Sequence, residues 1–220
     1  MDPTQTRVQS FLRHVVFLAR QFNGTPESIR ALHDVIAAFD SRDLMHLNRG
    51  YIPRTINSEG MISTGAVDVY KDDLSLINVF GFQKAGMRIP LHDHPGQYGI
   101  MKTQADAKNL YPQWMFPGSE TPKKTARFEG EIIIGASPSY TSHTALVRPG
   151  YGNLHEVTSL EPETYFMDVF LPSVSGGSYY HVDGPDPDTP GQLLQLKRLP
   201  GTPSEFKCDK LMFPKLYELH

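Results

Sequence analysis

The sequence predicts a mainly β fold: a small antiparallel β-barrel or double-sheet roll with N-terminal helices packed outside. Up to residue 50, apolar side chains recur at helical spacing. From Tyr51 onward, prolines and glycines recur every few residues and separate apolar runs of strand length. The length of 220 residues suits one such domain with a helical appendage. We therefore divide the chain into an N-terminal helical segment, residues 1–50, and a barrel domain, residues 51–220.

Two amphipathic helices are predicted in the N-terminal segment. Residues 3–20 carry an apolar stripe at helical spacing. Thr25 is the expected N-cap of the second helix and Pro26 its first helical residue, because a threonine oxygen can accept a free backbone N–H and proline has none to lose. The apolar stripe of this helix continues over residues 29–39, and one further short turn is expected at residues 41–45.

The strands of the barrel domain are predicted from short apolar runs bounded by turn residues. The clearest runs cover residues 74–82, 87–91, 131–135, 144–147, 164–171 and 193–199. With less regular runs included, we expect roughly eight to ten strands. Residues 102–127 are polar and interrupted by prolines, so we expect an irregular excursion that Trp114 pins down. Residues 183–191 repeat proline and glycine and predict a loop.

The composition argues against several classes of partner and location. A formal net charge of -3 gives no reason to expect nucleic acid or an anionic membrane as a partner. A single cysteine, Cys208, rules out an internal disulfide framework and fits a reducing compartment. The apolar segment at residues 15–19 is too short to span a bilayer and does not read as a signal peptide. We therefore expect a cytoplasmic monomer, with access to the nucleus left open.

The histidines around residue 93 indicate a metal site. His92 and His94 are separated by one residue, so on a β-strand both rings point to the same face. Imidazole is the commonest nitrogen ligand of zinc, copper, iron and nickel, which favours a transition metal over calcium or magnesium. A third histidine from another strand would complete the site. The best candidate is His155, which a Pro/Gly-rich turn delivers to the start of a strand expected near the first one.

Two further positions are candidates for the site. Asp168 interrupts an otherwise apolar strand, where a carboxylate is costly unless it is paired, hydrogen-bonded or near a metal. Beside a three-histidine metal it could hold a ligand or substrate through a hydrogen bond. Tyr179 and Tyr180 are neighbours on an expected strand, so only one of them can face the site, and Tyr179 is the candidate.

Four short motifs together resemble one known family. They are Pro90–Gly96 (Pro-Leu-His-Asp-His-Pro-Gly), Gly152–Glu156 (Gly-Asn-Leu-His-Glu), Met167–Val169 (Met-Asp-Val) and Ser178–Tyr180 (Ser-Tyr-Tyr). In combination they resemble the 2-aminoethanethiol (cysteamine) dioxygenase and plant cysteine oxidase family of thiol dioxygenases, which belongs to the cupin superfamily. The resemblance runs from roughly residue 74 to residue 182.

The resemblance implies a cupin-type barrel, a double-stranded β-helix, in which His92, His94 and His155 bind Fe(II). It implies that both atoms of O2 are added to a thiol to give a sulfinic acid, with Asp168 and Tyr179 as catalytic-site residues. The substrates of the family are cysteamine and proteins or peptides with an N-terminal cysteine. Oxidation of such a cysteine marks the protein for oxygen-dependent degradation, so a role in oxygen sensing is also implied.

Two departures from the family pattern lie close to the expected site. Val174 stands where a tyrosine is common, and Gly177 stands where some relatives carry a cysteine able to form a thioether link. Two other functions stay open. One is a non-catalytic cupin that binds a ligand or partner and keeps its metal for structure. The other is a zinc hydrolase, since three imidazoles and an open position also suit zinc.

Overall fold

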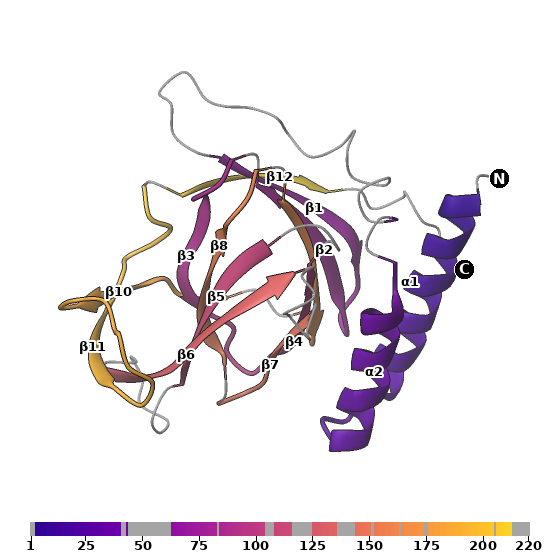
Figure 1. The fold of residues 1–220 in the computed structure, drawn as a ribbon. Coiled ribbons are helices and arrows are strands. Elements are labelled where there is room, and N and C mark those ends of the chain that lie inside the picture. The colour runs from indigo at the N-terminus through magenta and orange to yellow at the C-terminus, as the bar shows by residue number, and fades with distance from the viewer. Residues whose placement is uncertain are drawn as a thin grey trace.

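The fold is mainly β, with two N-terminal helices followed by twelve strands in the part of the chain that the computed structural model describes (Figure 1). The described residues are 3–40, 43, 63–82, 84–103, 108–115, 125–135, 144–150, 152–162, 164–173, 176–204 and 206–212. The predicted fold class, a small β-barrel with helices outside, is confirmed. Within these residues, neither helix has both the length and the apolar composition that a membrane crossing requires.

Helices α1 (Pro3–Gln21) and α2 (Pro26–Ala38) begin and end close to where the sequence predicts. The Thr25 hydroxyl accepts a hydrogen bond from the Ser28 backbone N–H at 3.4 Å, which caps the start of α2. The predicted cap and first residue of this helix are therefore confirmed. The short turn predicted at residues 41–45 lies outside the described residues, apart from Asp43.

The strands form two six-stranded sheets, which we call sheet A and sheet B. Sheet A contains, in spatial order, β12 (Lys207–Met212), β1 (Ser63–Lys71), β2 (Leu76–Phe82), β9 (Thr164–Leu171), β4 (Tyr98–Thr103) and β7 (Thr144–Val147). Sheet B contains, in spatial order, β10 (Tyr180–Asp183), β11 (Leu193–Arg198), β6 (Thr125–Gly135), β5 (Lys108–Met115), β8 (Leu154–Ser159) and β3 (Arg88–Asp93). Neighbouring strands are antiparallel, except that β1 and β12 run parallel.

The sequence prediction for residues 102–127 is wrong. Residues 102–127 contain all of β5 and the start of β6, and β5 lies inside sheet B between β6 and β8, so the described residues of this stretch form regular strands and not an irregular excursion. Pro112 and a register shift between Gln113 and Trp114 interrupt the alternating pattern by which a strand is recognised. Strands β1 and β12 also lie outside the predicted runs, whereas β7 and β9 have the predicted bounds.

Alternate residues of β9 face two different environments. Met167, Val169 and Leu171 pack with buried residues of α1 and α2 in one apolar cluster on the outer face of sheet A. Phe166, on the opposite face, packs inside the barrel, where its ring stacks on Phe80 at 5.0 Å between centroids. Figure 1 shows the two helices lying along one side of the barrel, with β10 and β11 at the opposite side. The inner face of β9 is therefore the face available to a site in the barrel.

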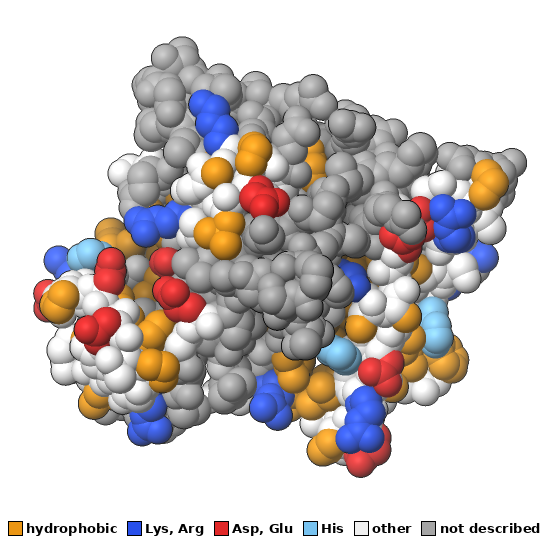
Figure 2. All heavy atoms as spheres, viewed as in Figure 1, with side chains coloured by type: hydrophobic (Ala, Val, Ile, Leu, Met, Phe, Trp, Pro, Cys, Tyr) orange, Lys and Arg blue, Asp and Glu red, His pale blue; other side chains and the backbone are white. Residues whose placement is uncertain are grey.

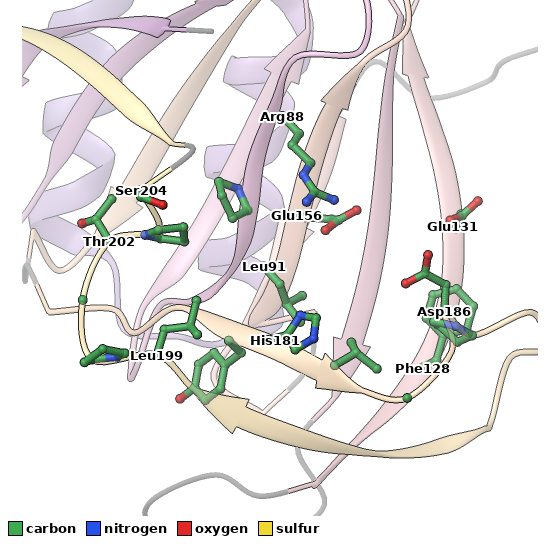
Figure 3. A pocket seen from close by; sticks show the side chains of 18 residues that line it. Arg88, Leu91, Phe128, Glu131, Glu156, His181, Asp186, Leu199, Thr202 and Ser204 are labelled. Carbon is green, nitrogen blue, oxygen red and sulfur yellow. The ribbon is translucent and has the colours of Figure 1, made fainter. Parts of the chain in front are cut away.

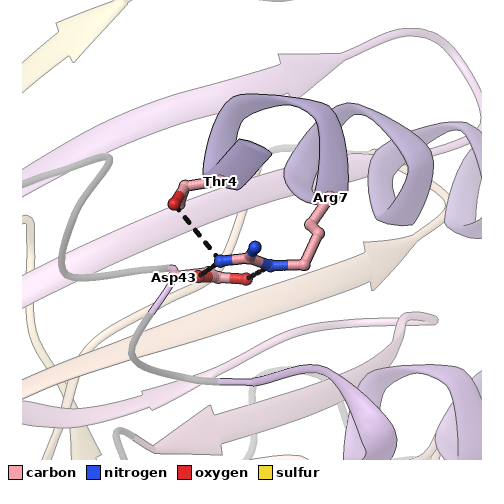
Figure 4. A network of polar contacts seen from close by, with 3 residues as sticks. All are labelled: Thr4, Arg7 and Asp43. Atoms are coloured by element: carbon pink, nitrogen blue, oxygen red, sulfur yellow. Dashed lines mark hydrogen bonds and ion pairs between the residues drawn. The ribbon is translucent and has the colours of Figure 1, made fainter. Parts of the chain in front are cut away.

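Polar contacts help to fasten the helices in place. Arg7 of α1 donates two hydrogen bonds to the Asp43 carboxylate, at 2.8 and 2.7 Å, and one to Thr4 at 3.2 Å (Figure 4). This bidentate pair ties α1 to the segment that follows α2. On β4, the Lys102 ammonium donates to the Ala37 carbonyl at 2.7 Å and so satisfies one of the last carbonyls of α2.

Candidate metal centre

The first two histidines lie at the end of β3. Residues 92 and 94 are alternate positions, and the β3–β8 pair has a register shift between Ile89 and His92. His94 directly follows the strand, and its carbonyl accepts a hydrogen bond from the Gln97 N–H at 3.1 Å, which closes the turn that carries the ring. The ring centroids of His92 and His94 are 4.8 Å apart.

The third histidine comes from the neighbouring strand. His155 on β8 lies directly opposite His92 in the antiparallel β3–β8 pair, and their ring centroids are 4.6 Å apart. The ring of His155 lies 5.0 Å from that of His94. The expectation that the strand carrying His155 lies beside the strand carrying His92 is confirmed. Each of the three rings offers one nitrogen, and these ligand atoms lie within 4.8 Å of one another.

Hydrogen bonds fix which nitrogen of two rings faces the site. The Nδ1 atom of His92 lies 2.7 Å from the Pro90 carbonyl, and that of His155 lies 3.2 Å from the Gly152 carbonyl. Because a carbonyl can only accept, each Nδ1 carries the proton and the lone pair lies on Nε2. This is the arrangement by which backbone carbonyls orient metal-binding histidines.

The His94 ring supplies the clearest indication that an ion fits. Its Nε2 atom is buried and has no hydrogen-bond partner among the described residues. A buried polar atom left without a partner is uncommon, and a metal ion would satisfy it. Three imidazole nitrogens form a donor set suited to iron, zinc, copper or nickel, so the residues present fit a transition metal.

The electrostatics of the cluster keep the rings in the metal-binding form. Burial lowers the pKa of His92, and it brings the pKa values of His94 and His155 well below the ordinary value. Repulsion from neighbouring imidazoles adds to the shift at His94 and His155, and a hydrogen bond with the Gln97 side chain only partly opposes it at His94. Neutral imidazole is the form that binds a metal.

Asn153 joins the turn that carries His94 to the start of β8, a role that the sequence does not predict. Its side-chain oxygen accepts a hydrogen bond from the His94 N–H at 2.9 Å, and its side-chain nitrogen donates to the His94 carbonyl at 2.6 Å. The side chain is 6% exposed. The only sequence signal was its position between Gly152 and His155 in the second motif.

Asp93 lies between His92 and His94 in the sequence, but its side chain forms hydrogen bonds with residues at and just before the start of β10. The carboxylate accepts hydrogen bonds from the Ser178 N–H at 2.6 Å and from the Tyr180 hydroxyl at 2.9 Å. Burial, and then the Asp93 charge, raise the pKa of Tyr180 to about 12.

A Cβ atom at Gly177 would lie 2.2 Å from the Asp93 carbonyl oxygen, so this backbone contact leaves no room for a cysteine at position 177. Val174, the other departure, lies outside the described residues.

Tyr179 lies beside the histidine cluster and Tyr180 does not. Tyr179 forms an isolated β-bridge with His92, and the two rings are 5.9 Å apart. The Tyr179 ring also lies 6.0 Å from the ring of Phe206. Tyr180 points to Asp93 and packs in a separate apolar cluster. The position of Tyr179 is compatible with the predicted role, which stays a prediction.

Asp168 lies on the inner face of β9, between Phe166 and Phe170. The ring of Phe170 stacks on His94, with centroids 4.4 Å apart and an interplanar angle of 23°. A Cβ atom at Gly99 would lie 2.6 Å from the Phe170 ring, so only glycine lets that ring lie across β4. The Asp168 carboxyl has no hydrogen bond or ion pair with any described residue, and burial raises its pKa to about 8.

A separate cavity of about 720 Å³ lies on the opposite face of sheet B. Its lining includes Glu156, the residue next to His155, so strand alternation points it away from the histidine cluster. Figure 3 shows Arg88 and Glu156 along one wall and Glu131 and Asp186 along another. Burial raises the pKa of Glu156 although Arg88 opposes the shift. Figure 2 shows acidic side chains gathered at this end of the molecule.

Comparisons with known proteins agree with this geometry. The family model PCO_ADO matches residues 32–183. The 2-aminoethanethiol dioxygenase of Mus musculus is 24% identical over 165 residues, covering 68% of this chain and 64% of the relative. The same enzyme of Homo sapiens is 25% identical over 171 residues, covering 68% of this chain and 61% of the relative. The matched region thus spans less than two thirds of the length of either relative.

Among solved structures, an uncharacterized conserved protein with a double-stranded β-helix domain from Klebsiella pneumoniae covers 60% of this chain and 86% of its own. It is 18% identical, with a TM-score of 0.40.

Proposed function

The chain belongs to the PCO_ADO family, and on that premise we propose that it is a non-haem Fe(II) thiol dioxygenase. It adds both atoms of O2 to a thiol and yields a sulfinic acid. The observation that carries this proposal is the convergence of three neutral imidazoles, with their ligand atoms within 4.8 Å of one another. The similarity to the 2-aminoethanethiol dioxygenases of Mus musculus and Homo sapiens supports the same class of reaction.

In this proposal His92, His94 and His155 hold the ion through their Nε2 atoms. When bound, Fe(II) supplies the redox chemistry that O2 requires and favours the thiolate over the thiol. Three neutral ligands leave the full double positive charge in place, which attracts an anionic sulfur. Addition of both oxygen atoms to a thiol needs no external reductant, because O2 itself accepts the electrons that the sulfur loses.

The protein residues around the cluster orient the substrate and exclude water. Phe170 covers His94, and Phe166 lies in the apolar cluster inside the barrel. Asp168 projects from the strand between these rings, and we propose that it accepts a hydrogen bond from the amino group of the substrate. Tyr179, whose ring lies 5.9 Å from that of His92, can place its hydroxyl near the reacting sulfur.

We propose two substrates with the same local chemistry, cysteamine and the N-terminal cysteine of a peptide or protein. Both carry an amino group two carbons away from the sulfur, and neither requires the protein to bind a free carboxylate. Action on cysteine-initiated proteins would connect this chain to oxygen-dependent protein degradation and oxygen sensing.

The test combines metal analysis with product analysis. The protein is purified without chelator, its bound metal is measured, and O2 uptake is followed with cysteamine and with a peptide that begins in cysteine. Mass spectrometry of each thiol should show a gain of two oxygen atoms, and both the gain and the uptake should be lost in His155→Ala. Bound metal without turnover would instead support a non-catalytic cupin, and zinc with O2-independent hydrolysis would support a hydrolase.

A further inference from the structure

A row of polar side chains crosses the inner face of sheet A. Asp68 on β1 lies opposite Asn78 on β2, and Asn78 lies opposite Asp168 on β9. The residues on either side of Asn78, Ile77 and Val79, pack toward the helices in the outer apolar cluster. Because side chains alternate along a strand, Asn78 points into the barrel. Neighbours directly opposite on antiparallel strands lie about 5 Å apart, so Asn78 and Asp168 can contact one common ligand.

Asn78 has a buried acceptor that no described residue satisfies. The side chain is 4% exposed, and its Oδ1 atom has no hydrogen-bond partner among the described residues. Such an atom lowers stability, because it has lost its hydrogen bonds to water without replacement. A valine or isoleucine would fit a β-strand at this position without that penalty. An unsatisfied acceptor aimed into the barrel therefore indicates a ligand that donates.

On β9, this row of polar side chains is one inward-facing position away from Phe170, the residue that contacts the histidine cluster. Asp168 and Phe170 are alternate residues on the inner face of β9, which places their Cα atoms about 7 Å apart. Phe170 stacks on His94 at 4.4 Å. A sulfur at the cluster, a two-carbon link and a hydrogen bond from an amino group together span a distance of this order.

We propose that Asn78 is a specificity residue, which accepts a hydrogen bond from the amino group of the thiol substrate while Asp168 accepts a second one. This inference rests on the proposed function. Two adjacent acceptors match an amino group, which has at least two N–H donors, better than a hydroxyl, which has one. A thiol without an amino group leaves both acceptors unsatisfied, and a site built for hydrogen bonding rejects such a ligand strongly.

The experiment measures binding, with O2 excluded, to the Fe(II)-loaded protein by calorimetry. The ligands are 2-aminoethanethiol, 2-mercaptoethanol and ethanethiol. The wild-type protein should bind the amine most tightly. Asn78→Leu, or the smaller Asn78→Val, should reduce the preference for the amine over ethanethiol by about tenfold or more. Val79→Ala, on the outer face of the same strand, should lower stability and leave the preference unchanged.

A second readout needs neither metal nor substrate. If Asn78 Oδ1 is unsatisfied, Asn78→Leu should raise the melting temperature of the metal-free protein, or leave it unchanged, while weakening amine binding. A clear fall in the melting temperature of both Asn78 variants would mean that Oδ1 has a structural partner and would overturn the inference. So would an undiminished amine preference in these variants, or equal wild-type affinity for the amine and ethanethiol. If the wild-type protein binds none of the thiols, the proposed function fails and the inference with it.

Discussion

His92 and His155 lie directly opposite each other across the antiparallel β3–β8 pair, with ring centroids 4.6 Å apart. Two of the three rings are therefore brought together by main-chain pairing, and the third, His94, is added by the turn at the end of β3. The relative position of His92 and His155 thus depends on strand register and not on loop conformation.

Removal of one ligand should abolish tight metal binding. In His155→Ala, two imidazoles remain, and the affinity for Fe(II) should fall by more than about 100-fold, since even changes next to a ligand cost 10- to 100-fold. Metal per chain, measured by mass spectrometry after dialysis, tests this. His181→Ala is the matched control, because His181 is exposed and lines the separate cavity on the opposite face of sheet B. Wild-type metal content in His155→Ala would contradict the assignment.

Loss of the Asn153 contacts should loosen the site without removing a ligand. Asn153→Ala removes the two hydrogen bonds to the His94 backbone, so metal affinity should fall by about 10- to 100-fold. The free energy of unfolding should fall by about 1–3 kcal/mol, because the His94 N–H and carbonyl lose these partners. Chelator competition and urea unfolding measure the two effects. Unchanged metal affinity in Asn153→Ala would show that Asn153 does not help to position His94.

Gly177 should be intolerant of any side chain. A Cβ atom there would lie 2.2 Å from the Asp93 carbonyl oxygen, so Gly177→Ala should destabilise the protein by about 2 kcal/mol or more. Gly201→Ala is the control, because no atom lies within 4 Å of the Cβ position and its backbone is not in the left-handed region. Thermal unfolding of the two variants makes the comparison. Equal melting temperatures would mean that the backbone approach at Asp93 relaxes freely.

Local chemistry explains which elements could be predicted from the sequence. The start of α2 follows from the Thr25 cap and Pro26, and β9 follows from one long apolar run, so both were predicted correctly. Strand β5 was missed because Pro112 and the adjacent register shift disrupt its alternation, and only pairing with β6 and β8 makes it a strand.

In the site, too, residues in continuous motifs could be predicted from the sequence, and a residue whose role depends on strand pairing could not. The two histidine motifs identified the three rings that converge, because each motif is a continuous stretch of sequence. Asn78 could not be predicted, since one polar residue in an apolar strand is usually taken to face solvent. Only the structure shows that Asn78 faces the barrel interior, because the helices cover the other face of β2 and the strand register places Asn78 beside Asp168.

The raised pKa of Asp168 should make stability depend on pH in the metal-free protein. The carboxyl titrates near 3.8 when it is free in water, and near 8 in the folded chain. Between these values the unfolded chain has lost this proton and the folded chain keeps it, so the folded state binds more protons. Stability should therefore fall as pH rises from about 4 to about 8 and level off above that range.

Asp168→Asn should remove this component, because an amide does not titrate. The full shift would correspond to about 6 kcal/mol, and partial solvent access to the half-buried side chain should reduce it to about 2 kcal/mol. Urea unfolding of both metal-free proteins at pH 5 and pH 8.5 gives the change of stability with pH, and the difference between the two proteins cancels the titration of the histidines. The variant should gain stability relative to wild type as the pH rises. A difference that does not change with pH would mean that Asp168 is already ionised in the folded protein.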